Sequence, residues 1–483
     1  MDGFLERFFP QVLAQRKEAA QHSGNAHYCQ FDSQVLELWQ SSMYLAGACA
    51  GLVASWVSSQ CGRKVTMALG GLAFVLGSAL QATAPEIVQL VIGRILLGIG
   101  IGFANQACPL YLSEMAPSHL RGSLNICFQL ATAVGILAAN SLNYGTSHLA
   151  PNVGWRLSLG LVGVPAVLVL LGSLALPETP SSLMQRGREQ EARKVLVAIR
   201  GTAEVEAELA EIRKAAGDAK ASSGGLVLFR HRRHLPQLLW CIAMPIMQQY
   251  TGINAFMFYA PQIFLILGMA QKASLLGILI VSGVNLLATV LAIYAVDRRG
   301  HYASFLSSIC SMVGRRKLLL AGGGQMLTAQ VAATALIYFT FQSAAPPFYS
   351  LVLLEVVICI FSSAFCYSYG PLAWLIPTEL GELSTRSMGQ SVNVTVQFLA
   401  SFSIAQSFMT LMCHVQWGTF LFFAGCVAVM TTCVALLLPE TKGVPLEEVS
   451  RIWEQHPVWG RVVGRNLRNP AAHSEQDQPK ILE

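Results

Sequence analysis

Apolar runs of membrane-crossing length recur along the whole chain and are separated by shorter polar segments. A bilayer-spanning helix needs about 20 mainly apolar residues, and hydropathy predicts about eleven such helices here. Since backbone polar groups cannot stay unpaired in lipid, these runs have to be helical. The pattern therefore predicts an all-α polytopic membrane protein. The predicted spans are residues 37–58, 66–84, 87–111, 122–143, 156–176, 237–266, 273–296, 318–341, 348–377, 388–412 and 417–438.

Composition supports this class and argues against others. Of the 483 residues, 53% are hydrophobic and 12% are charged, about half the charged share of a soluble domain. The net charge of +6 is concentrated in particular loops, so it does not indicate a nucleic-acid-binding face. The twelve cysteines lie mainly inside apolar runs without a CxxC pattern, which gives no support to a metal or redox site. We expect no enzymatic activity, no cofactor and no metal.

Basic residues on alternate loops predict the orientation in the membrane. One set of loops carries Arg63, Arg121, Arg315 and Arg386, among others, whereas the alternate loops carry few. Because cytoplasmic loops are enriched in Lys and Arg, this set is predicted to face the cytoplasm. The C-terminus is then inside and the N-terminal segment outside.

An internal repeat divides the chain into two halves. The motif Leu-Pro-Glu-Thr closes the first half at 176–179 and the second at 438–441. An acidic and a basic residue also stand seven positions apart in each half. Duplicated halves around a midplane site are typical of transporters. The repeated charges are Glu114, Arg121, Glu379 and Arg386.

The repeat and the hydropathy together predict five regions. These are an extracellular lid segment, an N-terminal helix bundle, cytoplasmic linker helices, a C-terminal bundle and a cytoplasmic tail, at 1–36, 37–182, 183–236, 237–443 and 444–483. Two predicted helices precede the basic motif of the second half, but only one precedes that of the first. If each half consists of six helices, the first half thus lacks one helix, at its N-terminus.

Several short motifs, taken together and in order, resemble the major facilitator superfamily and, within it, the sugar porter family. The runs 102–106 and 109–114 are similar to plant and green-algal hexose–proton symporters. The resemblance covers nearly the whole chain and implies the major facilitator fold, two pseudo-symmetric helix bundles with twelve spans. The motifs that carry it are Gly93-Arg94, Pro177-Glu178-Thr179, Gln248 to Asn254, Asp297 to Gly300, Gly314-Arg315-Arg316 and Pro439 to Gly443.

Three amide side chains on one apolar helix, Gln248, Gln249 and Asn254, are candidate ligand contacts. Uncharged amides both donate to and accept from hydroxyls, which suits a neutral polyol. They can equally pair with each other between membrane helices. The resemblance favours sugar contact, adds Trp374 as an apolar face for the sugar ring, and places Gln397 where these symporters usually have an asparagine. The implied sugar-binding residues are Gln129, Gln248, Gln249, Asn254, Asn285, Trp374 and Gln397.

Charged residues at the predicted cytoplasmic ends of the helices form a candidate gate. Ion pairs that form only when the halves close inside would stabilise the outward-facing state. Solvated loop charge is the alternative, but it does not explain the repeated spacing. Residues 301–314 are an insertion relative to the family and interrupt the second copy. The predicted gate residues are Arg63, Glu114, Arg121, Glu178, Arg315, Glu379, Arg386 and Glu440.

Arg94 lies in a run, 87–107, that is otherwise nearly uncharged, and is predicted to lie within the membrane. An intramembrane Arg costs about 2.5–3.5 kcal/mol unless it is paired. The resemblance implies that its partner is an aspartate on the family's first helix and that this pair couples the proton. By the same resemblance Met1 falls after that helix. We therefore expect the chain that starts at Met1 not to perform proton-driven transport.

The similarity to plant symporters also extends to Cys29 and Cys413. The predicted orientation places both on the outer face, where oxidising conditions permit a disulfide. Such a bond would hold the lid segment on the second half. Two free thiols are the alternative.

The resemblance implies a monomeric, multi-pass protein of the plasma membrane. Its partners would be a hexose, a proton and the lipid bilayer, and its mechanism proton-coupled symport by alternating access. A hexose facilitator without a proton is one alternative. A sugar sensor that binds but does not transport is another, although such sensors carry longer tails.

Overall fold

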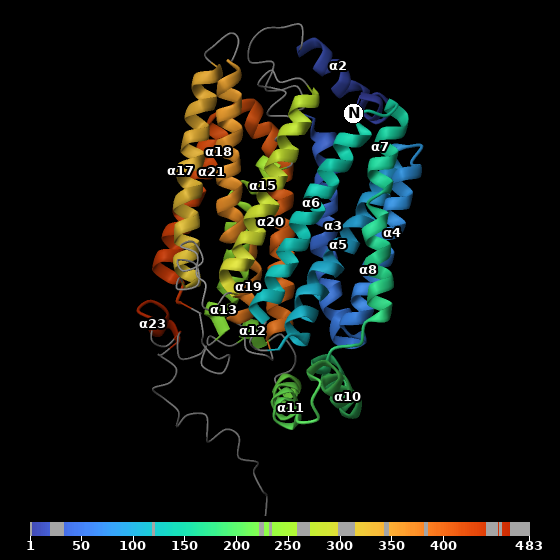
Figure 1. The fold of residues 1–483 in the computed structure, drawn as a ribbon, viewed down its shortest axis with the longest axis vertical. Coiled ribbons are helices and arrows are strands. Elements are labelled where there is room, and N and C mark those ends of the chain that lie inside the picture. Colours follow the sequence, from blue (N-terminus) through green and yellow to red (C-terminus); the bar gives the residue numbers. More distant parts are fainter. Residues whose placement is uncertain are drawn as a thin grey trace, which may run out of the picture.

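The computed structural model describes most of the chain, and every regular element in that part is a helix. Long helices run side by side in one bundle, with short helices at both of its ends (Figure 1). The described residues are 2–19, 33–117, 121–221, 227–230, 234–257, 271–297, 314–341, 347–380, 385–440, 453 and 456–463.

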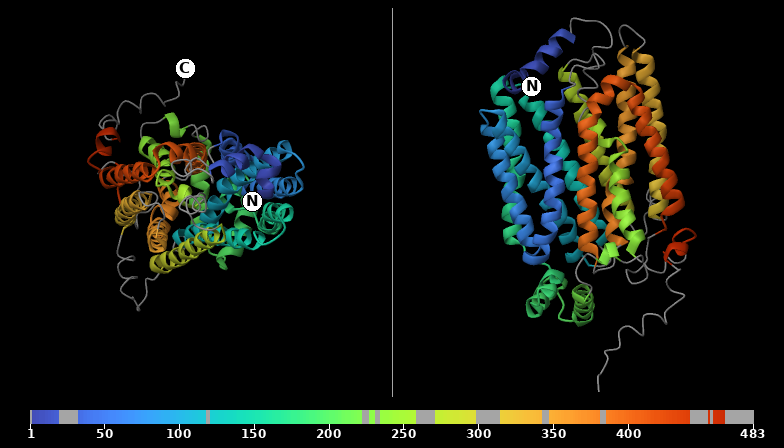
Figure 2. Two further views of the ribbon diagram at one scale, coloured as in Figure 1. Left: turned by 90° about the horizontal axis from the view of Figure 1, so that it is seen from above. Right: turned by 180° about the vertical axis from the view of Figure 1, so that it is seen from behind.

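Two sets of helices make up the bundle. Seen from above, the first set (blue to teal) lies beside the second (green to red) (Figure 2). The first set is α3 (Gln34–Cys61), α4 (Arg63–Thr83), α5 (Ile87–Met115), α6 (Arg121–Thr146), α7 (Pro151–Gly160) and α8 (Gly163–Ala175). The second set is α13 (Leu235–Gln249), α15 (Gln271–Asp297), α17 (Arg315–Phe341), α18 (Phe348–Tyr367), α19 (Tyr369–Glu379), α20 (Arg386–Val415) and α21 (Gly418–Leu437).

Short helices lie at the two ends of the bundle. We call the end with α1 and α2 the outer end, and the end with the linker helices the inner end, following the predicted orientation. The short helices are α1 (Asp2–Phe8), α2 (Pro10–Ala19), α9 (Pro180–Gln185), α10 (Glu189–Arg200), α11 (Glu206–Ala221), α12 (Val227–Arg230) and α23 (Trp459–Val463).

The helices follow the predicted spans closely, which confirms the all-α membrane class. Seven helical segments of the described chain are long and apolar enough to cross a bilayer. Three predicted spans are broken rather than continuous. The fifth divides between α7 and α8, the ninth divides at Ser368, and the sixth is interrupted after α13. At the break after α13, Gly252 has a φ of +81°, a conformation that glycine adopts without steric cost.

Glycines let α5 approach α3 closely, as small residues commonly do between membrane helices. A Cβ at Gly98 would stand 2.3 Å from the carbonyl oxygen of Met43, and one at Gly102 would stand 2.6 Å from that of Gly47. No other residue type fits at either position. This contact places Arg94, one turn from Gly98, directly against α3.

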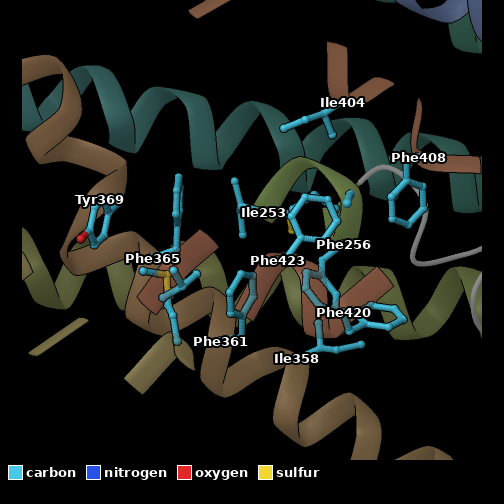
Figure 3. Packing of buried hydrophobic residues seen from close by; sticks show 14 of the residues in the cluster. Ile253, Phe256, Ile358, Phe361, Phe365, Tyr369, Ile404, Phe408, Phe420 and Phe423 are labelled. Atoms are coloured by element: carbon cyan, nitrogen blue, oxygen red, sulfur yellow. The ribbon is translucent and has the colours of Figure 1, made fainter. Parts of the chain in front are cut away.

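The core of the second half is largely aromatic (Figure 3). The ring of Phe256, just after the break at Gly252, lies 4.8 Å from that of Phe361 and 5.1 Å from that of Phe420, centroid to centroid. This packing anchors the segment that follows α13 against α18 and α21. The break therefore has a fixed geometry.

At the outer end, α1 packs onto the first half through aromatic rings. The ring of Phe4 lies 5.2 Å from that of Trp39 and 5.7 Å from that of Trp155. The Arg7 guanidinium donates to the Pro85 carbonyl oxygen at 3.1 Å. Helix α1 thus covers α3 and α7.

Candidate functional site

Buried amides from both halves meet at Gly370, near the start of α19. Nε2 of Gln248 donates to the carbonyl oxygens of Tyr369 at 3.3 Å and of Gly370 at 3.0 Å. Nε2 of Gln129, on α6, would be 3.4 Å from a Cβ at Gly370. Amides of α6 and α13 thus approach the same stretch of backbone at Gly370.

The helix break after α13 shapes a second amide contact. The amide Nδ2 of Asn254 donates to Oε1 of Gln249, five residues earlier. A continuous helix would place these two side chains on different faces, but the turn at Gly252 brings them together. Gln249 is buried, with 4% of its surface exposed.

Two of these amides have an oxygen that no hydrogen bond uses. On α15, Nδ2 of Asn285 donates to Oγ of Ser362 at 3.1 Å, while its Oδ1 has no partner. Oε1 of Gln248 is likewise buried without a partner. Buried acceptors without a donor are uncommon in folded proteins. Both oxygens could accept hydrogen bonds from the hydroxyls of a bound ligand.

Trp374 is packed by side chains of both halves. Its ring meets that of Phe128, on α6, edge to face at 5.5 Å. It also packs in a cluster with Tyr44 of α3 and with Phe398 of α20. Gln397, next to Phe398, is buried with 8% of its surface exposed. An aromatic face and polar amides therefore lie together where the halves meet.

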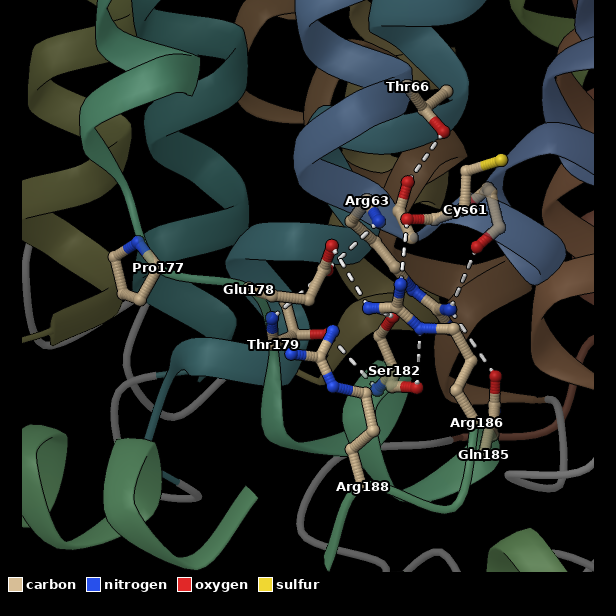
Figure 4. Close-up of polar contacts among 12 residues, drawn as sticks. Cys61, Arg63, Thr66, Pro177, Glu178, Thr179, Ser182, Gln185, Arg186 and Arg188 are labelled. Carbon is tan, nitrogen blue, oxygen red and sulfur yellow. Dashed lines mark hydrogen bonds and ion pairs between the residues drawn. The ribbon is translucent and has the colours of Figure 1, made fainter. Parts of the chain in front are cut away.

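At the inner end of the first half, charged residues form a buried network (Figure 4). Nη2 of Arg63 contacts Oε1 of Glu114 at 2.8 Å, and the two side chains are 2% and 8% exposed. The backbone N–H of Arg63 donates to Oε1 of Glu178 at 2.9 Å. Arg186 contacts Glu178 at 3.4 Å. The side chain of Arg121 lies outside the described part.

Gly62 makes this network possible. Its φ of +99° turns the chain sharply between α3 and α4. A Cβ at this position would stand 2.1 Å from Oε2 of Glu178. The turn therefore needs glycine on both conformational and steric grounds.

The second half repeats one part of this network. Oε1 of Glu440 accepts from the backbone N–H of Arg315 at 2.7 Å, and Oε2 accepts from that of Arg316 at 3.2 Å. Glu440 thus binds the N-terminus of α17 as Glu178 binds that of α4, where a carboxylate is favoured by the helix dipole. The side chains of Glu379 and Arg386 lie outside the described part.

Arg94 lies against an aromatic ring. Its guanidinium carbon is 4.0 Å from the centroid of the Trp39 ring, within the range of a cation–π contact. Nη1 is 3.9 Å from Sδ of Met43. Within the described residues, no carboxylate lies within 4.0 Å of the Arg94 side chain.

Cys413, near the outer end of α20, is disulfide-bonded. The other nine described cysteines are free. Cys29 lies outside the described residues, so its pairing with Cys413 remains a prediction.

Sequence reasoning missed two groups of residues. Arg186 was not predicted to join Glu178, because only the fold of α9 brings it there. A second set of buried amides, near the inner ends of α5, α13 and α20, was also missed. Its one sequence signal is the helical spacing of Gln390, Asn393 and Gln397 along α20. The set comprises Gln106, Gln237, Gln390 and Asn393.

Known proteins similar to this chain agree with its architecture. Residues 3–453 match the family model "Sugar (and other) transporter". Sugar transport protein MST5 of Oryza sativa subsp. japonica is 48% identical over 96% of this chain and 86% of its own length. Sugar transport protein 11 of Arabidopsis thaliana is 45% identical over 95% of this chain and 87% of its own length.

Solved structures of a bacterial transporter share the fold. The proton:xylose symporter XylE bound to 6-bromo-6-deoxy-D-glucose superposes with a TM-score of 0.76, at 24% identity, over 94% of this chain and 97% of that one. The inward open conformation of XylE from E. coli gives a TM-score of 0.66, at 23% identity, over 94% of both chains. The chain has the major facilitator fold and is a multi-pass membrane protein rather than an enzyme, and it belongs to the sugar (and other) transporter family.

Proposed function

We propose that this protein carries a hexose across a membrane by alternating access, in symport with a proton. The observation that carries the proposal is the meeting of two buried, uncharged amides at Gly370, Gln129 from the first half and Gln248 from the second. Oxygens of Gln248 and Asn285 lack a donor, and sugar hydroxyls are donors of the right kind. Trp374 adds an apolar surface for the ring of a pyranose.

The proposed site residues are uncharged, which favours a neutral substrate. A charged ligand in a buried site needs an opposite charge to offset its desolvation. Nearly half of the residues in two plant relatives named sugar transport proteins are identical here, which supports a sugar as the substrate. We place the protein in the plasma membrane, as a monomer.

The contacts between α3 and α20 fit an occluded form, closed on both sides of the site. Near the outer end, Oγ of Ser41 donates to Oε1 of Gln406 at 2.8 Å. Near the inner end, Oγ of Ser391 donates to the Gly51 carbonyl oxygen at 3.4 Å. Alternating access requires one of these contacts to open at a time. The Arg63, Glu114 and Glu178 network lies within the first half and ties the inner ends of α4 and α5 to the segment before α9.

A facilitator without a proton is the second candidate, and the surroundings of Arg94 favour it. Coupling through Arg94 requires an acidic group whose proton affinity depends on the guanidinium. In the part of the chain that the structure describes, Arg94 faces an indole ring instead. The proposal of proton symport rests on the family resemblance. The dependence of hexose uptake on outer pH distinguishes the two candidates.

Uptake of labelled hexose in a yeast strain without its own hexose carriers tests both candidates. The protein should take up hexose saturably, and faster as the outer pH falls from 7 to about 5. Uptake that does not change with outer pH would indicate the facilitator. No uptake by protein that reaches the plasma membrane would refute the proposal.

A further inference from the structure

Near the inner ends of α5 and α20, two glutamines join the halves without any charge. Nε2 of Gln106 donates to the carbonyl oxygen of Ser387 at 3.3 Å, and Nε2 of Gln390 donates to that of Asn105 at 3.4 Å. Each side chain thus crosses to the backbone of the opposite half. The two contacts are reciprocal, and both must break when the inner ends separate.

The amides of this cluster have unused hydrogen-bonding capacity. Gln106, Gln390 and Asn393 are 0%, 2% and 1% exposed, and the side-chain oxygen of each is buried without a partner. In both glutamines Nε2 must be the atom facing the carbonyl, so the amide orientation is fixed and the oxygen is the unused atom. Nε2 of Gln237, on α13, is also buried without a partner. Three acceptors and one donor therefore lie unused near this contact.

The cluster is continuous with the site around Gly370. Gln390, Asn393 and Gln397 are spaced by three and four residues, so they line one face of α20. Seven residues of helix rise by about 10 Å, which places Gln390 that far inward of Gln397. A stripe of amides on one face of α20 thus leads from the proposed sugar site to the inner end.

We propose that Gln106, Gln390 and Asn393 form a second, exit-side subsite for the sugar, exposed when the inner ends of α5 and α20 separate. The proposal rests on the proposed hexose transport. In the closed state the two glutamines hold the halves together. On opening they lose their carbonyl acceptors, and hydroxyls of a hexose leaving the first site take the place of these carbonyls and donate to the amide oxygens.

Because the same amides serve first as a latch and then as ligands, no step leaves all of them without partners. The cluster carries no charge that would offset the desolvation of a charged ligand. The subsite therefore accepts uncharged polyols and should not bind sugar phosphates.

The test uses a thiol placed beside the subsite. Ser391→Cys is a nearly isosteric change at a buried position, 1% exposed, which a reagent can reach only when the halves part. The variant is combined with Gln248→Leu to disable the first site. Inside-out vesicles are treated with N-ethylmaleimide, with and without hexose, and labelling is read for each cysteine by mass spectrometry. The native Cys61, exposed at the inner end of α3, is the internal control.

We expect hexose to slow labelling of the introduced thiol at least threefold while labelling of Cys61 is unchanged. Adding Gln390→Met and Asn393→Leu should remove this protection. Equal labelling with and without hexose in the Gln248→Leu background would overturn the subsite, provided that the protein with an intact first site transports hexose. Failure of that protein to transport would refute the proposed function itself, and the two failures are thus distinguishable.

Discussion

The proposed sugar site is defined by single side chains whose oxygen atoms have no hydrogen-bond donor. The amide nitrogens of Gln248 and Asn285 each donate to a protein acceptor, and their oxygens have no partner. Leaving a buried polar atom unpaired costs about 1–3 kcal/mol. A ligand that supplies hydroxyl donors recovers that free energy on binding, which links the cost in the empty site to affinity for sugar.

Gln249→Ala tests the proposed site at a neighbouring amide. The change removes a buried amide that Asn254 contacts and leaves a sugar hydroxyl without its partner. A loss of about 1–3 kcal/mol corresponds to a rise of about 5- to 150-fold in the KM for hexose uptake. Gln89→Ala, an amide of α5 that bonds only near Thr83 at the outer end, is the matched control. Normal uptake affinity in Gln249→Ala would remove Gln249 from the site.

At the scale of helices, glycine turns and helix termini position the charged groups. Gly62 joins α3 directly to α4 and leaves room for Glu178 at the N-terminus of α4. The same arrangement recurs at Glu440 and α17. These carboxylates bind helix ends through backbone N–H groups, which sequence spacing alone does not indicate.

Gly62→Ala should disrupt the inner network of the first half. The backbone conformation at this position costs about 1–3 kcal/mol for a residue with a Cβ, and the Cβ would collide with Glu178. We expect a lower melting temperature in detergent. Gly172→Ala in α8, where a Cβ would meet nothing within 4 Å, should leave the melting temperature unchanged. Equal melting temperatures for the two variants would contradict this account of the turn.

The described part of the C-terminal tail docks on the second half and should do so in a pH-dependent way. Nε1 of Trp459 donates to the Leu437 carbonyl oxygen at 2.8 Å. Nδ1 of His456 accepts from the backbone N–H groups of Val458 at 3.3 Å and Trp459 at 3.5 Å. A protonated imidazole cannot accept these bonds. Burial, together with the nearby positive charge of Arg316, lowers the pKa of His456.

The sign of this pH dependence follows from the lowered pKa. Docking is fully stable above the ordinary histidine pKa of about 6.5 and weakens as the pH falls below it, because the undocked segment binds the proton more readily. Hydrogen exchange at 453–463, corrected for its intrinsic pH dependence, should be faster at pH 5.5 than at pH 7.5. In His456→Ser, which keeps a capping oxygen, the difference should vanish. Persistence of the difference in His456→Ser would exclude His456 as its cause.

Much of the fold was predictable, because apolar length in a bilayer leaves little choice but a helix. The breaks at Ser368 and after Gln249 were not, since each depends on packing between helices distant in sequence. The amides Gln248 and Gln249 stood out on an apolar helix, but their distinct partners, Gly370 and Asn254, did not. The buried contact of Gln106 with α20 joins residues about 280 positions apart, and no local pattern indicates it.

At the scale of the whole molecule, two similar halves enclose one polar region where they meet. Contacts of α3 with α20 join the halves near both ends, and a glutamate bound to a helix N-terminus recurs at the inner end of each half. This symmetry suits a carrier in which either end can open around a central site. The central claim is that such opening moves a hexose together with a proton.

Simultaneous recording of hexose uptake and outer pH tests that claim most directly. Yeast cells without their own hexose carriers, expressing the protein, are suspended in weakly buffered medium at about pH 5. Addition of labelled hexose should produce saturable uptake and a matching alkalinisation of the medium, and Gln248→Leu should abolish both. Uptake without alkalinisation would contradict proton coupling, and the absence of any hexose uptake by protein in the plasma membrane would contradict the account as a whole.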